Sequence, residues 1–215
     1  MGWTVALPTL VAATLVAAIP GLLRALPAPV GEPDAAPYDP LATRAFAVTA
    51  AALMALAGTT AFVLAPVHWP AWTGLASCGV LSAMIDARTG YLPRPLAWAA
   101  WALTGLGLTV VALLAGFEPM LRAGVGAASA TALFWVFWRV GGGFGFGDVR
   151  LAPVIGASAA AVGWPVFFGA FILGGLAGVG WGLCWRAMGR GRSFPYGPAL
   201  VAGPFLALAV WSLTA

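Results

Sequence analysis

The fold is decided by the stretch VRLAPVIGASAAAVGWPVFFGAFILGGLAGVGWGLCWRA, residues 149–187, in which Arg150 and Arg186 are the only charged residues. A helix that crosses a membrane needs about 20 apolar residues, so this stretch is too long for one crossing and long enough for two. Gly-Trp-Pro at residues 163–165 is a typical helix break. The stretch therefore predicts two membrane helices that run in opposite directions.

The rest of the chain has the same character. Of its 215 residues, 62% are hydrophobic and only 7% are charged, whereas soluble domains carry roughly 25% charged residues. The apolar segments are long and uniform, unlike the alternating segments of about 10 residues in barrel strands. We therefore expect an all-α, polytopic helical bundle in the lipid bilayer. The net charge of +4 lies in arginines at the borders of these segments and does not indicate nucleic-acid binding.

Proline, glycine and charged residues divide the chain into apolar segments. We expect about eight transmembrane helices, at residues 3–23, 45–64, 71–85, 96–116, 120–138, 149–162, 166–185 and 195–213. The first segment lacks a basic N-terminal region and a clear cleavage site, so we expect a retained helix rather than a signal peptide. The chain is then a single polytopic domain, in which a first helix and a short cytoplasmic loop (1–43) precede a helical core (44–215).

Arginine positions predict the orientation, because Lys and Arg collect on the cytoplasmic side of short loops. With the N-terminus outside, alternating spans place nine of the ten basic residues inside and only Arg122 outside. A single crossing at residues 149–187 would move the last three arginines to the other side. We therefore expect both termini outside the cell membrane.

Two of the six acidic residues adjoin apolar segments. Asp86 ends the third segment, in SAMIDARTGYLPRPLAW (82–98), and Asp148 precedes the sixth, in GGGFGFGDVRLAPVIGA (141–157). Two crossings separate them, so both lie on the cytoplasmic face at similar depth. A carboxylate beside hydrocarbon is costly and indicates a functional site. The other acids lie in a polar loop or an outer turn: Glu32, Asp34, Asp39 and Glu118.

Two carboxyls brought together share a proton, because like charge and low dielectric raise one pKa. Such a pair suits peptide hydrolysis: the ionised member takes a proton from water and the protonated member polarises the scissile carbonyl. No metal or other cofactor is expected. The single histidine, His68, falls on the opposite face, and Cys78 and Cys184 are scattered.

The glycines around Asp148 allow positive φ angles and close backbone approach. We therefore expect an extended substrate peptide to lie against the loop at Gly145 and Gly147. Two simpler interpretations stay open. Asp148 can be the N-cap of the sixth helix, and Asp86 can be a helix-end charge paired with Arg88 or Arg94.

Three ordered motifs carry a family resemblance. GFGFGDVRLAPVIGA (143–157) resembles the GxGD segment of the type IV prepilin peptidases, which are aspartic membrane proteases. IDARTGYLPRPLAW (85–98) is similar to that family's first aspartate motif, and SFPYGPALVAGPFLAL (193–208) to its third conserved piece. A lone GxGD motif is weak evidence for this family, whereas three motifs in the same order within a frame of eight spans are strong evidence for it.

The resemblance implies that Asp86 and Asp148 are the catalytic aspartates and that Gly145, Gly147 and Arg150 contact substrate. It implies removal of a short basic leader from a prepilin or pseudopilin, just before the substrate's hydrophobic helix. The expected location is the inner membrane, with the active site facing the cytoplasm.

Departures from the family pattern also matter. Arg150 replaces the usual lysine, and Arg94 replaces the usual Asp or Asn. Between the first two spans, full-length bacterial members carry a cytoplasmic domain, often with two C-x-x-C pairs, that is associated with N-methylation. Here that loop is short, proline-rich and free of cysteine, so we expect a peptidase without methyltransferase activity.

Two alternatives remain. Pro-Ala-Leu at 198–200 is shared with presenilin-like proteases of other membrane substrates, although these usually have tyrosine before the first aspartate and this chain has Ile85. A transporter could also use paired carboxylates, but its acids should lie near the bilayer midplane rather than at span ends.

Overall fold

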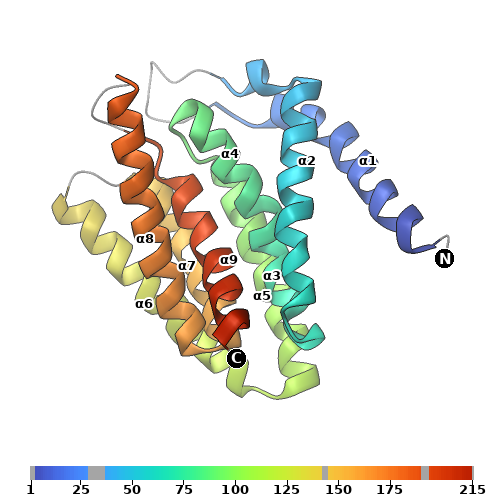
Figure 1. The fold of residues 1–215 in the computed structure, drawn as a ribbon, viewed down its shortest axis with the longest axis vertical. Coiled ribbons are helices and arrows are strands. Elements are labelled where there is room, and N and C mark those ends of the chain that lie inside the picture. The colour runs from blue at the N-terminus through green and yellow to red at the C-terminus, as the bar shows by residue number, and fades with distance from the viewer. Residues whose placement is uncertain (1–2, 29–36, 142–144, 190–193, 215) are drawn as a thin grey trace.

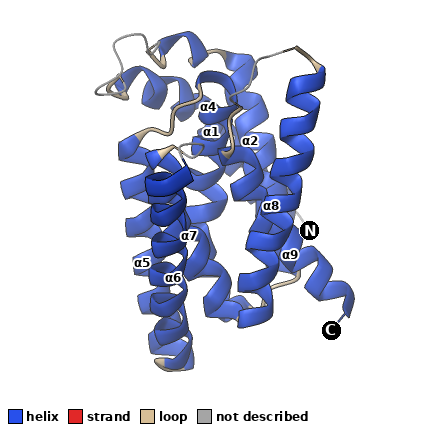
Figure 2. Ribbon diagram, turned by 90° about the vertical axis from the view of Figure 1, so that its left-hand side faces the viewer, coloured by secondary structure: helices blue, strands red, loops and turns tan. Residues whose placement is uncertain are grey.

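The computed structural model describes residues 3–28, 37–141, 145–189 and 194–214, with side chains between residues 14 and 213. Within those ranges the chain is helical and contains no β-strand (Figure 2). The α-helices are α1 (Trp3–Ala25), α2 (Arg44–Gly58), α3 (Trp69–Gly74), α4 (Val80–Thr89), α5 (Arg94–Ala115), α6 (Glu118–Gly141), α7 (Phe146–Val162), α8 (Trp164–Ala187) and α9 (Gly197–Thr214). Short 3-10 helices are η1 (Asp39–Leu41), η2 (Thr59–Phe62) and η3 (Pro66–His68), and a π-helical turn, η4 (Leu75–Gly79), joins α3 to α4.

The predicted break inside residues 149–187 is confirmed. Helix α7 ends at Val162, Gly163 is extended, and α8 begins at Trp164. Pro165 falls in the first turn of α8, where a missing N–H breaks no helical hydrogen bond. The third predicted segment is instead composite, because the π-helical turn interrupts it between α3 and α4.

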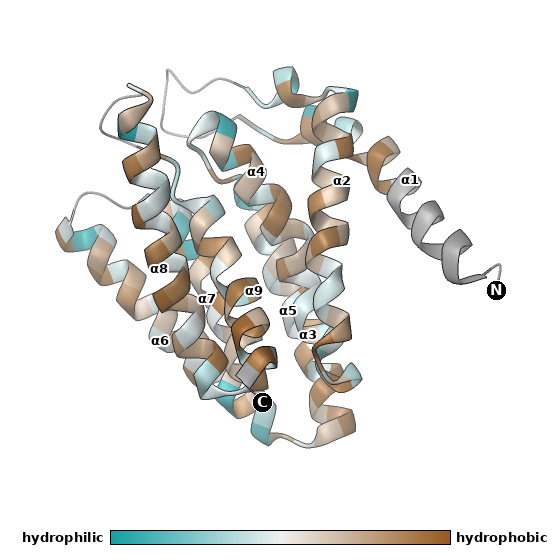
Figure 3. Cartoon of the chain, viewed as in Figure 1, coloured by the Kyte–Doolittle hydropathy of each residue, from teal (hydrophilic) through white to brown (hydrophobic). Residues whose placement is uncertain are grey.

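In the part of the chain that the structure describes, four helices are long and apolar enough to cross a membrane: Arg44–Phe62, Arg94–Ala115, Glu118–Gly141 and Trp164–Ala187. Shorter apolar helices cover Thr14–Ala25 and Gly197–Leu213. Figure 3 shows apolar residues along the lengths of the helices. Among them are Leu113, Leu121 and Leu183, which are 80%, 68% and 65% exposed. Continuous apolar surface of this kind is typical of contact with lipid.

Helix α7 forms the centre of the bundle. Thirteen of its residues are buried, on every side of the helix, and it packs against α5, α6 and α8. Its small residues permit this close packing: a Cβ placed on Gly126 of α6 would lie 2.5 Å from the Cβ of Ala160. The Ser158 hydroxyl also donates a hydrogen bond to the Ala71 carbonyl of α3, at 2.9 Å. The first turn of α7 is therefore held in a fixed place.

Helices α4 and α9 lie side by side near the centre of Figure 1. Helix α4 ends at Gly90, whose φ of +73° suits a glycine cap. Helix α9 packs on both α4 and α8. At the edge of the bundle, α1 packs against α2. The end of α4, the start of α7 and the start of α9 meet at one end of the bundle.

Candidate active site

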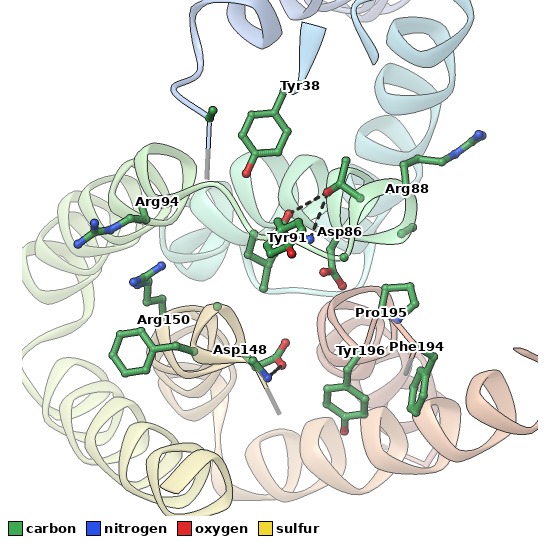
Figure 4. A pocket seen from close by; sticks show the side chains of 18 of the residues that line it. Tyr38, Asp86, Arg88, Tyr91, Arg94, Asp148, Arg150, Phe194, Pro195 and Tyr196 are labelled. Atoms are coloured by element: carbon green, nitrogen blue, oxygen red, sulfur yellow. Dashed lines mark hydrogen bonds between the residues drawn. The ribbon is translucent and has the colours of Figure 1, made fainter. Parts of the chain in front are cut away.

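A polar pocket of about 600 Å³ opens at this end of the bundle (Figure 4). Three separate pieces of chain line most of it: residues 86–92, 145–148 and 194–196. These pieces come from the three motifs that the sequence singled out. Both Asp86 and Asp148 line the pocket, and Figure 4 shows their carboxyls directed into the same space. The fold therefore brings together two acids that lie far apart in the chain.

Asp86 lies in the last turns of α4 and is only 5% exposed. Its Oδ2 atom accepts a hydrogen bond from the backbone N–H of Gly197, at 2.8 Å. A Cβ on residue 197 would lie 2.6 Å from that oxygen, so only glycine allows this approach. Asp86 makes no ion pair with Arg88 or Arg94 among the described side chains. The interpretation of Asp86 as a helix-end charge paired with arginine is therefore wrong.

Asp148 lies in the first turn of α7 and is also 5% exposed. Its Oδ2 atom accepts a hydrogen bond from the backbone N–H of Gly145, at 3.1 Å. The N-cap of α7 is Gly145 and Asp148 is the third residue of the helix, so the interpretation of Asp148 as the N-cap is wrong. Its carboxyl instead bonds back to the free N–H of the N-cap residue. The same carboxyl faces the polar pocket, so capping and a chemical role are compatible.

Asp86 directly follows the apolar segment 71–85, and Asp148 directly precedes the apolar segment 149–162. Burial raises the pKa of Asp86 from 3.8 to about 6, although the Gly197 hydrogen bond partly opposes the rise. Burial, and then the charge of Asp86, raise the pKa of Asp148 to about 7, against the hydrogen bond from Gly145. Between these values the pair holds about one proton, which provides one acid and one base in the same pocket.

Gly145 and Gly147 lie beside Asp148, and neither uses the positive φ that glycine allows: Gly145 has φ −75° and Gly147 lies inside α7. Close approach, the other property that glycine allows, is used at Gly147. Gly147 is needed for packing: a Cβ there would lie 2.8 Å from the Cβ of Leu92. Its small size lets α7 approach the segment that follows α4. Gly142 and Gly143 lie outside the described residues, as do Glu32 and Asp34 of the acidic loop.

Arg150 lies at the rim of the pocket with Arg88 and Arg94. Its guanidinium stacks 4.7 Å from the centre of the Phe146 ring, and its backbone carbonyl accepts a hydrogen bond from the Trp101 indole at 2.7 Å. Both contacts fix the arginine to the start of α7. Its positive charge is therefore held next to the pocket rather than left free in solvent.

Motifs and spacing assign no role to Tyr38, which the structure places in the pocket. Tyr38 comes just before η1, is only 2% exposed, and points its hydroxyl into the pocket (Figure 4). Burial, and then the negative charge of Asp86, raise the pKa of this phenol. Lone aromatic residues in a loop carry no periodic signal. The backbone N–H of Gly197 was also missed, although its motif was identified.

The described side chains offer no metal site: no group of three His, Cys, Asp or Glu residues is close enough to hold an ion. His68, Cys78 and Cys184 lie in η3, η4 and α8, and none of them lines the pocket. The side chains of the pocket that can act on a substrate include the two carboxyls, the arginines and the phenols of Tyr38, Tyr91 and Tyr196.

Comparison with known proteins gives one match. The model of a family described as the type IV leader peptidase family matches residues 73–183. The matched region contains Asp86, Asp148 and the glycines beside Asp148, whereas Tyr38 and residues 194–196 lie outside it. No curated protein and no solved structure matches the chain.

Proposed function

Because the chain belongs to the type IV leader peptidase family, we propose that it is a membrane-embedded aspartic endopeptidase with Asp86 and Asp148 as one catalytic unit. The observation that carries this proposal is the single polar pocket, into which two separate helices each place a buried carboxyl. The family supports a peptidase, and this pair is the acid and base that hydrolysis of a peptide bond requires.

The proposed reaction uses one water and no covalent intermediate. Asp86, which the Gly197 N–H stabilises in its charged form, takes a proton from the water as its oxygen attacks the scissile carbonyl carbon. Asp148, which has the higher pKa, donates its proton to the carbonyl oxygen. The tetrahedral intermediate then collapses: Asp86 gives its proton to the leaving nitrogen, Asp148 takes the proton of one hydroxyl of the intermediate, and the C–N bond breaks. Asp148 is then protonated and Asp86 ionised, as at the start.

We propose a prepilin or pseudopilin as substrate, cut between a short basic leader and its hydrophobic helix. The proposed frame is about eight membrane helices in the inner membrane, with both termini outside and the pocket facing the cytoplasm. Seven described arginines support this frame, because each lies close to a helix end that this topology places on the cytoplasmic side, where basic residues collect. They are Arg24, Arg44, Arg88, Arg94, Arg139, Arg150 and Arg186. The short, cysteine-free loop before α2 supports a peptidase without methyltransferase activity.

The arginines at the rim constrain how such a substrate lies. Arg94 and Arg150 line the same side of the pocket (Figure 4), and their charge repels the basic residues of a leader. We therefore place those basic residues in the cytosol, away from these two arginines. Only the residues next to the cleaved bond then enter the pocket, beside Gly145 and Gly147.

Co-expression with a leader-bearing prepilin tests this function. Asp86→Asn and Asp148→Asn should each reduce leader cleavage by at least about 10⁴-fold, because each removes the acid or the base. Glu118→Gln is the matched control, since this exposed acid pairs with Arg122 at 2.8 Å and does not line the pocket. Its cleavage rate should equal that of the wild type.

Other outcomes favour other functions. Wild-type cleavage by both Asp variants contradicts the assignment of both residues. Cleavage only of leaderless membrane proteins, within their spans, favours a presenilin-like protease. Transport of a solute into liposomes without proteolysis favours the transporter, although both carboxyls lie at helix ends rather than at mid-helix.

A further inference from the structure

An apolar groove adjoins the polar pocket and has no part in the reaction described so far. Its volume is about 490 Å³, and it lies between α2 with η2, α4 and α9. None of its lining side chains is charged. The two hydroxyls in it, of Thr59 and Thr60, are already bonded to the Leu56 and Ala57 carbonyls of their own helix. The surface that remains is hydrocarbon.

Each helix contributes one continuous stripe to the groove. On α4 the lining residues are Val80, Ala83, Met84 and Ala87, and on α9 they begin with Pro198, Val201, Ala202 and Phe205. Both sets follow the i, i+3, i+4, i+7 spacing of a single helix face. The stripe on α9 continues to Ala209, so the groove is about 16 Å long, enough for roughly eleven residues of helix.

The groove and the polar pocket are adjacent. Ala87 lines both of them. It directly follows Asp86, and Pro198 directly follows Gly197, whose N–H binds Asp86. A helix in the groove would therefore end beside the two carboxyls. Small residues at Ala57, Ala83 and Ala202 would let that helix pack closely.

We infer that the groove holds the apolar helix of the membrane-anchored substrate and so delivers the bond before that helix to Asp86 and Asp148. The inference rests on the proposed function. It commits to a helix rather than a lipid chain for two reasons. Three helical stripes give the groove a uniform apolar lining, and one end of the groove lies at Ala87 and Pro198, next to Asp86 and Gly197, where a substrate helix would place the bond that precedes it.

Photo-cross-linking tests the occupant directly. A photoreactive residue at Leu56, which is 64% exposed and lines the groove, is compared with one at Leu176 of α8, which is 63% exposed and outside it. Each photoreactive residue is introduced separately into the full-length Asp148→Asn protein, which is then irradiated together with the prepilin. We expect a cross-link to the substrate's helix from Leu56 and none from Leu176. Cross-links from Leu56 to lipid alone, or equal yields from both positions, would overturn the inference.

Kinetics with two substrates separate this inference from the proposed function. Ala202→Trp should raise KM for the anchored prepilin at least about tenfold, because the indole fills part of the groove. It should leave unchanged the cleavage of a soluble peptide that carries the leader and the cut bond but no helix. Val48→Trp, at a 49% exposed position of α2 outside the groove, should change neither.

If Ala202→Trp leaves KM for the anchored substrate unchanged, or reduces the cleavage of both substrates equally, the inference that the groove binds the substrate helix is contradicted. A wild-type protein that cuts neither substrate contradicts the proposed function instead, so the two failures differ. The cross-linking result stands even if Ala202→Trp fails to fold.

Discussion

The polar pocket and the apolar groove meet at Ala87, yet they differ in every chemical respect. The pocket contains two buried carboxyls and an arginine rim, whereas no charged side chain lines the groove. The pocket is formed at helix ends, and the groove runs along helix faces. This difference indicates that the two regions have separate functions: the pocket at the helix ends carries out the polar reaction near the interface, and the groove along the helices binds an apolar partner deeper in the bilayer.

This comparison makes a general prediction. Changes in the polar pocket should affect cleavage of every substrate equally, and changes in the groove should affect only substrates that carry a helix. The rate measurements on Gly197→Ala and on the pH dependence can break or sharpen that distinction, and both are therefore made with the anchored prepilin and with the helix-free peptide.

Gly197→Ala should have the largest effect of these. The added methyl group would lie 2.6 Å from Asp86 Oδ2 and must displace the carboxyl. Displacement of a catalytic group by about 1 Å costs about 10²-fold in rate, so kcat/KM should fall by about that factor with both substrates. Gly175→Ala in α8, where no atom lies within 4 Å of the new Cβ, is the control and should be neutral. A loss confined to the anchored substrate would break the comparison.

The pH dependence should show a smaller change, about tenfold for each pH unit beyond the optimum. Below about pH 6 both carboxyls are protonated and the base is lost, whereas above about pH 7 both are ionised and the acid is lost. A profile of kcat/KM against pH should therefore be bell-shaped, with its maximum between these values. The two substrates should give the same limbs, because only the pocket titrates. Different limbs, or a rate that stays constant to pH 9, would contradict this.

Asp148→Asn should stabilise the protein slightly while it abolishes activity. The pKa of Asp148 is raised to about 7 in the folded state, so the folded state binds its proton more tightly than the unfolded state. The wild type therefore loses stability as pH rises from about 4 to 7. Asparagine can keep the hydrogen bond from Gly145 without any charge. We expect a free energy of unfolding higher by roughly 1–3 kcal/mol at pH 8.

Thermal melts in detergent measure this effect, and a pH of about 2.5 is the internal control, because Asp148 is protonated there in both states. A melting temperature that falls at pH 8, or a difference that persists at the low pH, would show that burial of this charge is not the cause.

Much of the helical frame could be predicted from local sequence. The Gly163 break and the apolar segments depend on residue type and spacing alone. The π-helical turn at Leu75–Gly79 could not be predicted, because its cause lies in packing against other helices. The close crossing of α6 and α7 at Gly126 likewise depends on contacts between distant parts of the chain.

The candidate site was only partly predictable. Asp86 and Asp148 stand out in sequence, because carboxylates beside apolar helices are rare, and the structure brings them into one pocket. Their catalytic role stays a prediction, as does substrate contact by Gly145, Gly147 and Arg150. Tyr38 reaches the pocket from a loop more than forty residues before Asp86, and only the fold reveals that placement. Gly145 does not use the positive φ that glycine allows, because helix α7 begins directly after it.

The central claim is that Asp86 and Asp148 act as one unit, and a double variant tests it most directly. Cleavage of the helix-free peptide is measured with Asp86→Asn, Asp148→Asn and the combined variant under the same conditions. If one shared proton links the two carboxyls, the second substitution adds no further loss, because either one alone already removes the acid–base pair. Losses that multiply in the combined variant, or a single variant that keeps the wild-type rate, would contradict the claim.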